Sequence, residues 1–346
     1  MSQIKVISIG SDRTLFEEGS PARVRARAYA TRLGELHVVV FALRVHKLAE
    51  VHDGPLHIYP TNSRSKVFYI PNAARAAQHI VADVMTVQDP FEAGLAGLLG
   101  RKGLPLHVQI HTDLFAPGFA RGLNRARLAL ARIVLPRAAQ VRTVSVHLAE
   151  ALRIYYPHVP VSVLPIFVDI QKYRAIERRP HPRFNTTLLW VGRFEREKNP
   201  ALAIHALASA RAKGHDVGLV MLGTGQLDKE LHELAQALGV GEWVEFAGWQ
   251  EPAEFLGMAD LALVTSQYEG YGRQIVEALA AGVPVLSTDV GVARETGALV
   301  ATEKEFADAL NKWLTNGPRE AELTNYPYRS FEDYVEKYCA DIMKVL

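Results

Sequence analysis

The chain has 346 residues, of which 49% are apolar, and a net charge of +2. Compact domains usually hold roughly 100 to 200 residues, so this length predicts two domains, each with its own core. Cys339 is the only cysteine, which excludes a disulfide framework or a thiolate metal site within the chain and fits a reducing compartment. Because the first residues lack a signal-peptide pattern and no apolar run nears roughly 18 residues, we expect a cytoplasmic protein, peripheral at most to the inner membrane surface.

Charge is distributed unevenly along the chain. Residues 1–168 hold 20 Lys+Arg against 11 Asp+Glu, whereas residues 169–346 hold 19 against 26. An anionic partner of the basic half, such as a phosphorylated acceptor, a membrane surface or nucleic acid, would explain this difference. Ordinary variation of surface charge explains it equally well.

The first half alternates short β-branched runs with helical patterns, which is typical of βαβ units. We expect a helix near residues 22–32 and a parallel sheet covered by helices. The expected strands are residues 4–9, 37–43, 83–88, 106–111 and 141–145.

The alternation stops at residues 173–185, a charged segment with two prolines that is typical of an interdomain linker, and then restarts. Further strands are expected at residues 187–191, 217–222, 244–247, 261–265 and 283–287. Residues 331–346 have apolar side chains at helical spacing and should pack one face against a domain. We therefore expect an N-terminal Rossmann-like domain of residues 1–168 plus this last helix, and a C-terminal one of residues 169–330.

Two glutamates flank a glycine-containing loop after the expected strand 261–265. Gly270 and Gly272 let the backbone approach a ligand closely, and the helix that follows presents its N-terminal N–H groups to an anion such as phosphate. Glu277, in that helix, is placed for paired hydroxyls such as those of ribose, and Glu269 for the other end of the ligand. Alternatively, Glu269 is solvated and Glu277 interacts with the helix dipole.

A second motif, GRFEREKNP, follows the expected strand 187–191. Arg193 lies at the strand end, Lys198 lies at the helix start, and Pro200 is suited to open that helix. Two fixed cations there would stabilise a departing diphosphate. Pairing with the charged residues 195–197 in a surface cluster is the alternative.

The order GRFEREKNP, MLGTGQL, VEFAGW and YEGYGRQIVEALAAGVPVLSTDVG resembles the donor-binding half of the retaining glycosyltransferases of family 4, which have the GT-B fold. Their signature is a glutamate, seven residues and a second glutamate, the spacing of Glu269 and Glu277. The resemblance covers about residues 162–299 closely and the N-terminal half loosely. It implies two Rossmann-like domains facing each other across a deep cleft, with the last helix crossing back to the first domain.

By this resemblance, Arg193 and Lys198 bind the pyrophosphate of the donor and Glu277 its ribose. The donor sugar is contacted by Glu269 together with the backbone of the loop from Gly270 to Gly272. Tyr271 and Arg273 are further candidates for donor binding in this loop. Arg273 and Gln274 replace the small or apolar residues usual in the family, and residues 166–169 replace a common Asn-Gly-Val-Asp.

The N-terminal half supplies two further candidates. Gly19, before the first helix, resembles the family's glycine loop, of which one glycine remains. His111, at the end of an expected strand, is similar to the histidine that the family places facing the donor sugar. Without the resemblance, a lone histidine is more often structural.

Several other motifs are excluded. Asp228 stands where a dinucleotide fingerprint after Gly223 and Gly225 needs glycine or alanine. Neither an Asp-x-Asp pair nor a P-loop occurs, and no histidines have ligand spacing on a predicted helix. We therefore expect no cofactor beyond a nucleotide-sugar co-substrate, no metal, and no nucleic-acid partner, for which a reading motif is missing.

Residues 121–142 hold six arginines interleaved with apolar residues and resemble an amphipathic helix that ends near Pro136. This segment could lie on an anionic membrane and present a lipid-linked acceptor. A core helix with a solvated arginine face is the simpler alternative.

The sequence thus predicts a metal-independent, retaining glycosyltransferase that moves a sugar from a UDP- or GDP-type donor to a hydroxyl acceptor, such as a lipid-linked or cell-surface glycan precursor. A nucleotide-sugar epimerase or hydrolase in the same cleft, and a non-catalytic sugar-nucleotide-binding protein, are the alternatives.

Overall fold

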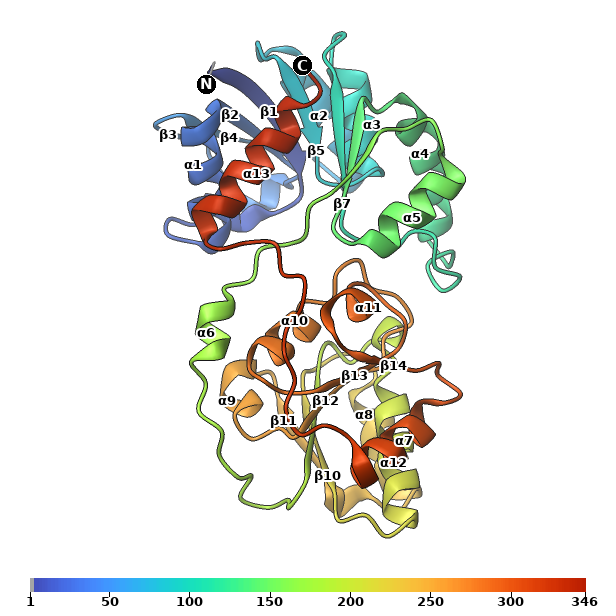
Figure 1. Cartoon of the computed structure of the whole chain (residues 1–346). Helices are drawn as coiled ribbons and strands as arrows, with labels where there is room; N and C mark the ends of the chain where they lie inside the picture. Colours follow the sequence, from blue (N-terminus) through green and yellow to red (C-terminus); the bar gives the residue numbers. More distant parts are fainter. Residues whose placement is uncertain (1–2) are drawn as a thin grey trace. The chain divides into compact units, whose positions relative to one another are not determined.

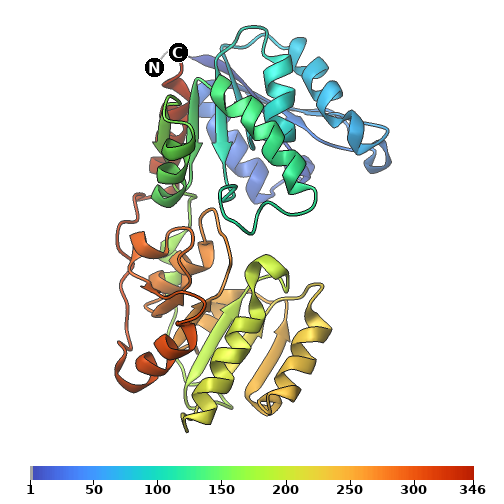
Figure 2. The same cartoon turned by 90° about the vertical axis from the view of Figure 1, so that its right-hand side faces the viewer.

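The computed structural model describes residues 3–346, which form two compact units. Unit 1 holds the chain up to Pro165 together with Tyr328–Leu346, and unit 2 holds Ile166–Pro327. The domain boundaries expected from the sequence, after residues 168 and 330, lie within a few residues of these divisions. Each unit contains one sheet covered by helices (Figures 1 and 2).

The sheet of unit 1 has eight strands in the order β3-β4-β2-β1-β5-β6-β7-β8, and all neighbours are parallel except β3 and β4. The strands are β1 (Ile4–Gly10), β2 (Gly34–Val40), β3 (Val51–Asp53), β4 (Leu56–Pro60), β5 (Val84–Val87), β6 (Leu106–Ile110), β7 (Gln140–Thr143) and β8 (Val161–Val163). Its helices are α1 (Pro21–Leu33), α2 (Tyr69–Gln78), α3 (Glu92–Gly100), α4 (Asn124–Val134), α5 (Val146–Tyr155) and α13 (Phe331–Met343).

Local chemistry fixes how α1 begins and ends. Ser20 caps it by accepting a hydrogen bond from the Arg23 N–H at 3.2 Å, and Pro21 occupies its first turn, where no N–H is needed. The helix ends at Gly34, whose φ of 120° is a backbone conformation that residues other than glycine rarely adopt. Because Gly34 also begins β2, that strand starts three residues before the expected position at His37.

The last helix, α13, lies beside α1 across one face of the first sheet (Figure 1). The hydroxyls of Tyr29 and Tyr334 are hydrogen-bonded at 2.9 Å, and the rings of Tyr29 and Tyr338 stack at 4.0 Å. Asp341, which is 2% exposed, accepts hydrogen bonds from three residues of the sheet: His107 Nε2 (3.1 Å), Gln140 Nε2 (3.0 Å) and Ser162 Oγ (2.9 Å). The expectation that this helix crosses back to the first domain is confirmed.

The sheet of unit 2 has six parallel strands in the order β11-β10-β9-β12-β13-β14. They are β9 (Thr187–Val191), β10 (Gly218–Leu222), β11 (Val244–Gly248), β12 (Leu261–Val264), β13 (Val285–Ser287) and β14 (Leu299–Val300). The helices are α6 (Ile170–Arg174), α7 (Pro200–Ala212), α8 (Asp228–Ala237), α9 (Pro252–Leu256), α10 (Arg273–Ala280), α11 (Ala293–Thr296) and α12 (Phe306–Asn316). One apolar core joins β9, β10 and β12 to α7, α8 and α12 around the buried rings of Trp190, Phe194 and Phe306.

One expectation about an individual segment was wrong. Residues 173–185 are not an interdomain linker, because the Arg179 N–H donates to the Gly257 carbonyl at 2.8 Å and Phe184 is buried, so they belong to unit 2. In the basic segment 121–142, the helix expected to end near Pro136 is confirmed. The segment contains α4, a 3-10 turn at the helix-breaking Pro136, and then β7, where Arg142 is only 2% exposed.

No helix within residues 3–346 has both the length and the apolar character that crossing a bilayer requires.

Candidate functional site

The order of the strands in unit 2 reverses between β9 and β12. The chain runs outward from β9 through β10 to β11 on one side, and from β12 through β13 to β14 on the other. In open parallel sheets, ligands bind outside the carboxyl ends of the strands at such a switch point. The loops that follow β9 and β12 carry the two motifs singled out in the sequence, so the topology brings both to one end of this sheet.

Lys198 and Glu269 form an ion pair at this switch point. The same carboxylate oxygen, Glu269 Oε1, also accepts hydrogen bonds from Ser266 Oγ at 2.8 Å and from Gln274 Nε2 at 3.0 Å. The side chains of Lys198 and Glu269 are 18% and 12% exposed, so water reaches the pair while most of each side chain is covered. A cation and a carboxylate from the two motifs are therefore held in direct contact.

Hydrogen bonds between the two loops fix the position of Lys198. The indole N–H of buried Trp190 donates to Thr265 Oγ1 at 2.8 Å, and the Thr265 hydroxyl donates to the Lys198 carbonyl at 2.9 Å. The Gln267 N–H donates to the Glu197 carbonyl at 2.8 Å. These bonds tie the backbone of Lys198 to the end of β12. The charge of Lys198 is therefore held in position before a ligand binds, which a site that stabilises a developing charge requires.

The glycine loop before α10 has the geometry that its sequence suggested. Gly272 has a φ of 83° and stands at the N-terminal cap of α10, where its left-handed conformation turns the chain into the helix. Tyr271 is 4% exposed, and its carbonyl accepts from the Val292 N–H at 2.9 Å. A Cβ on Gly291 would lie 2.2 Å from that carbonyl oxygen, so the loop is held by close backbone packing. The first turn of α10, whose N–H groups have no partner within the helix, follows this loop directly in the chain.

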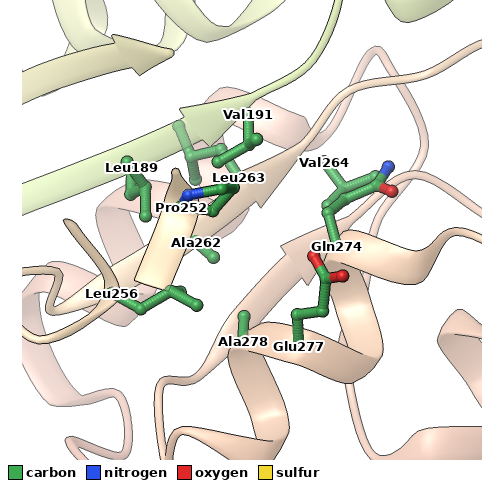
Figure 3. Close-up of a pocket in the computed structure, with 10 residues that line it drawn as sticks. All are labelled: Leu189, Val191, Pro252, Leu256, Ala262, Leu263, Val264, Gln274, Glu277 and Ala278. Atoms are coloured by element: carbon green, nitrogen blue, oxygen red, sulfur yellow. The ribbon is translucent and has the colours of Figure 1, made fainter. Parts of the chain in front are cut away.

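Glu277 lies on the second turn of α10, with a side chain 11% exposed, and accepts a hydrogen bond from Arg273 at 3.0 Å. Tyr173, on α6, which packs against α10, is buried. Burial, together with the negative charge of Glu277, raises the pKa of its phenol. Figure 3 shows Glu277 beside a small pocket between α9, α10 and the strands β9 and β12. Its other lining residues are Leu189, Val191, Pro252, Leu256, Ala262, Leu263, Val264, Gln274 and Ala278.

Arg193 is placed differently from Lys198. Its guanidinium pairs with Glu197 at 2.8 Å, and 70% of its side chain is exposed. The pairing within the motif that the sequence offered as an alternative is thus present for this arginine. An exposed pair of this kind contributes little to stability and is easily exchanged for a ligand.

The glycines of the MLGTGQL segment have a packing role. A Cβ on Gly223 would lie 1.8 Å from the Gly192 carbonyl oxygen, and one on Gly225 would lie 2.5 Å from the Phe194 carbonyl oxygen. The Phe194 N–H also donates to the Thr224 carbonyl at 2.9 Å. These glycines therefore let the loop after β10 lie against the loop that carries Arg193.

In unit 1, His111 directly follows β6, and its ring atom Nε2 is buried without a hydrogen-bond partner among the described residues. Burial, with the positive charges of Arg142 and Arg25, lowers the pKa of His111 to about 3, so the ring is neutral at physiological pH. Gly19, the other candidate in this unit, is exposed and has a φ of 76° just before α1.

Sequence reasoning missed three members of the site in unit 2: Tyr173, Ser266 and Gln274. Ser266 and Gln274 were visible as polar neighbours of Glu269, but nothing showed that both side chains turn toward it. Tyr173 lies about a hundred positions before Glu277, and its segment was assigned to a linker. Only the fold brings α6 against α10.

Two family models match most of the chain. The model described as Glycosyl transferases group 1 matches residues 171–330, and the one described as Glycosyltransferase Family 4 matches residues 23–172. The lipopolysaccharide core biosynthesis glycosyltransferase LpsE of Rhizobium meliloti is 34% identical over 131 residues, which are 37% of this chain and 37% of LpsE. A D-inositol 3-phosphate glycosyltransferase of Rhodococcus erythropolis is 34% identical over 219 residues, 56% of this chain and 50% of that protein. The matched part of the chain thus spans half or less of these relatives.

Solved structures resemble the chain over nearly its whole length. Anabaena HepE in complex with UDP and glucose has a TM-score of 0.65 at 18% identity, over 99% of this chain and 97% of that one. Sucrose-phosphate synthase from Thermosynechococcus elongatus has a TM-score of 0.70 at 18% identity, over 98% and 94%. At this identity the likeness shows the fold, which is GT-B as expected from the sequence.

Proposed function

The chain belongs to the family 4 glycosyltransferases, and from this premise we propose that it transfers a sugar from a nucleoside diphosphate sugar, of UDP or GDP type, to a hydroxyl acceptor. The observation that carries the proposal is the Lys198–Glu269 pair at the β9/β12 switch point, beside the N-terminus of α10. A diphosphate needs fixed positive charge and N–H donors, and a sugar needs carboxylates that accept from its hydroxyls. This end of the sheet offers both.

We assign the parts of the donor to named groups. The diphosphate contacts Lys198, Arg193 and the first N–H groups of α10, while Glu269 accepts from hydroxyls of the sugar. Glu277 accepts from the ribose hydroxyls, with Tyr173 holding its carboxylate in place.

The proposed reaction breaks the bond between the anomeric carbon and the β-phosphate oxygen and forms one between that carbon and the acceptor oxygen. The leaving phosphate gains negative charge as the bond breaks, and Lys198 stabilises that charge. The acceptor proton passes to the departing phosphate oxygen, so the new bond forms on the face that the leaving group vacates and the anomeric configuration is retained. The protein's cations supply the charge stabilisation, so the proposal requires neither a metal ion nor another cofactor.

We further assign the acceptor to unit 1, near the neutral ring of His111 and the loop that contains Gly19. A lipid-linked acceptor is supported by α4, on which Arg125 and Arg127 are exposed, and by the neighbouring side chains of Leu123 (86% exposed) and Ile133 (43%). Cationic and apolar side chains together favour peripheral contact with an anionic membrane surface.

The proposal is tested in two steps. UDP- and GDP-sugars are first screened by thermal shift, because a ligand that binds the folded state raises the melting temperature. The sugar that binds is then incubated, with and without EDTA, with candidate hydroxyl acceptors, and the anomeric configuration of the product is read by NMR. Retention and full activity in EDTA are expected. An inverted product refutes the mechanism. Release of free sugar or of an epimer at the full rate without acceptor would instead indicate a hydrolase or an epimerase.

A further inference from the structure

Three histidines stand in one row across the edge of the sheet in unit 1. The backbone register pairs His37 of β2 with His57 of β4, and His57 with His52 of β3. Residues paired across strands point to the same face of a sheet, and so do residues two apart on one strand. Glu35, two residues before His37, therefore joins the same face.

The side chains of this row converge. His37 Nε2 lies 2.9 Å from Glu35 Oε1, and His57 Nε2 lies 3.4 Å from the same oxygen. One ligand-type atom from each of Glu35, His37 and His57 lies within 4.8 Å of the other two. With bonds of about 2.0 to 2.2 Å, the ligands of a tetrahedral zinc ion lie about 3.3 Å apart. The two measured distances bracket this value.

The ring nitrogens of His37 and His57 that face away from Glu35 also have polar partners, as the histidines of metal sites usually do. His37 Nδ1 is 3.2 Å from the Tyr59 hydroxyl, and His57 Nδ1 is 2.9 Å from His52 Nδ1. If each Nδ1 carries its proton and donates it to that partner, both Nε2 lone pairs face Glu35. Partners of this kind orient the histidines of metal sites. Lys5 Nζ holds the other carboxylate oxygen of Glu35 at 2.8 Å, leaving Oε1 for the ion.

The partial burial of the cluster suits an ion that enters from solvent. The side chains of Glu35, His37 and His57 are 27%, 10% and 21% exposed, so the site is sheltered yet open to entry. Neutral imidazole and ionised carboxylate are the forms that bind a divalent transition metal.

The geometry points to a binding site for a divalent transition metal ion of the zinc type, formed by Glu35, His37 and His57, with His52 and Tyr59 orienting the two imidazoles. The cluster includes the first half of β2, whereas the candidate sites lie beyond the carboxyl ends of strands, so this ion is separate from sugar transfer. Bound there, it would fasten the β3–β4 hairpin to β2.

The test uses the whole chain, with any affinity tag removed and with metals stripped by EDTA and desalting. Equilibrium dialysis against zinc, followed by elemental analysis, is expected to give one tightly held ion per chain. A titration with Co²⁺ should produce the visible absorption of a tetrahedral site, which zinc then abolishes. His37→Gln and His57→Gln should lower the affinity at least tenfold, whereas His46→Gln, an exposed histidine in a neighbouring loop, is the matched control and should not.

Melting temperature gives a second readout. Zinc should raise the melting temperature of the wild type and of His46→Gln, but not that of His57→Gln, because an ion that binds only the folded state stabilises it. Metal-free melting curves show whether each variant folds. Should His37→Gln not fold, Glu35→Gln takes its place, since that side chain is more exposed. Wild-type protein that holds no more zinc than His57→Gln, or equal loss in His46→Gln, overturns the proposal.

Discussion

Removing the charge of Lys198 tests the candidate donor site most directly. Lys198 is the cation that both loops of the β9/β12 switch point hold in place, through the Lys198 carbonyl and its ion pair with Glu269. Lys198→Ala removes that charge and leaves Glu269 with its hydrogen bonds from Ser266 and Gln274. The variant should therefore fold, with a loss of about 1 to 2 kcal/mol in the free energy of unfolding. This expected loss is smaller than the roughly 3 to 5 kcal/mol that breaking a fully buried pair costs, because both side chains of this pair are partly exposed.

The loss in turnover should be larger than the loss in stability. A unit charge about 4 Å from a phosphate oxygen contributes roughly 4 kcal/mol at the effective dielectric of a partly exposed site. Removing one preorganised donor from a developing anion typically lowers kcat by about 10²- to 10³-fold. We expect Lys198→Ala to fall in that range, and Lys198→Arg, which keeps the charge but not its position, to retain intermediate activity.

The assay is initial-rate transfer with saturating acceptor, measured beside chemical denaturation of each variant. Lys213→Ala is the matched control, because Lys213 is half exposed, lies in the same unit and pairs with Asp308 at 3.3 Å. It should leave kcat unchanged. A Lys198→Ala variant that is folded and turns over within threefold of the wild type would refute the assignment of Lys198 to the leaving diphosphate.

Three further predictions concern the same two units. Glu269→Gln should abolish most transfer while UDP or GDP binds several-fold more tightly in calorimetry, since Lys198 no longer has a competing carboxylate; weaker binding would contradict this. Asp341→Ala should lower the free energy of unfolding by about 3 kcal/mol, because two buried donors and one partly buried donor lose their acceptor. Glu336→Ala, 59% exposed on the same helix, should cost under about 1 kcal/mol. Burial lowers the pKa of His107 and of His111, so the unfolded chain takes up protons that the folded one does not. Stability should therefore fall below about pH 6.5, by up to about 1.4 kcal/mol per pH unit for each histidine; urea midpoints that stay constant from pH 7 to 5 would contradict this.

The regular elements of the fold were largely predictable because parallel strands buried on both faces give short apolar runs. Residues 187–191 were assigned as a strand with the bounds that β9 has, and the last helix began at Phe331 as expected. Short strands at or next to the sheet edges were not predicted. β3, β4, β8 and β14 have only two to five residues and no fully buried run, so their sequences do not differ from those of loops.

Contacts between residues that lie far apart in the sequence could not be predicted either. The histidine row of unit 1 was overlooked because ligand spacing was sought on helices, whereas the row arises from the pairing of β2, β3 and β4. The segment 173–185 resembled a linker because prolines and charges interrupt its periodicity. The buried rings of Tyr173, His181 and Phe184 fix it to unit 2, but charged residues and prolines stand between them in the sequence.

The ion pairs explain why the sequence alone left the donor site open to a structural interpretation. Arg193, Lys198 and Arg273 pair with Glu197, Glu269 and Glu277 respectively, so the pairing offered as an alternative to function is physically present. Pairing and function are compatible, however. A diphosphate that enters must exchange a carboxylate for its own oxygens, and sugar hydroxyls must take the place of the cation at the carboxylate. Each cation thus has a carboxylate as its partner before binding and a phosphate oxygen after it. The site therefore never holds an unpaired charge away from water, where such a charge is costly. The same exchange should make donor affinity depend on salt less steeply than the number of cations suggests, since each cation already has a counter-charge before the donor arrives.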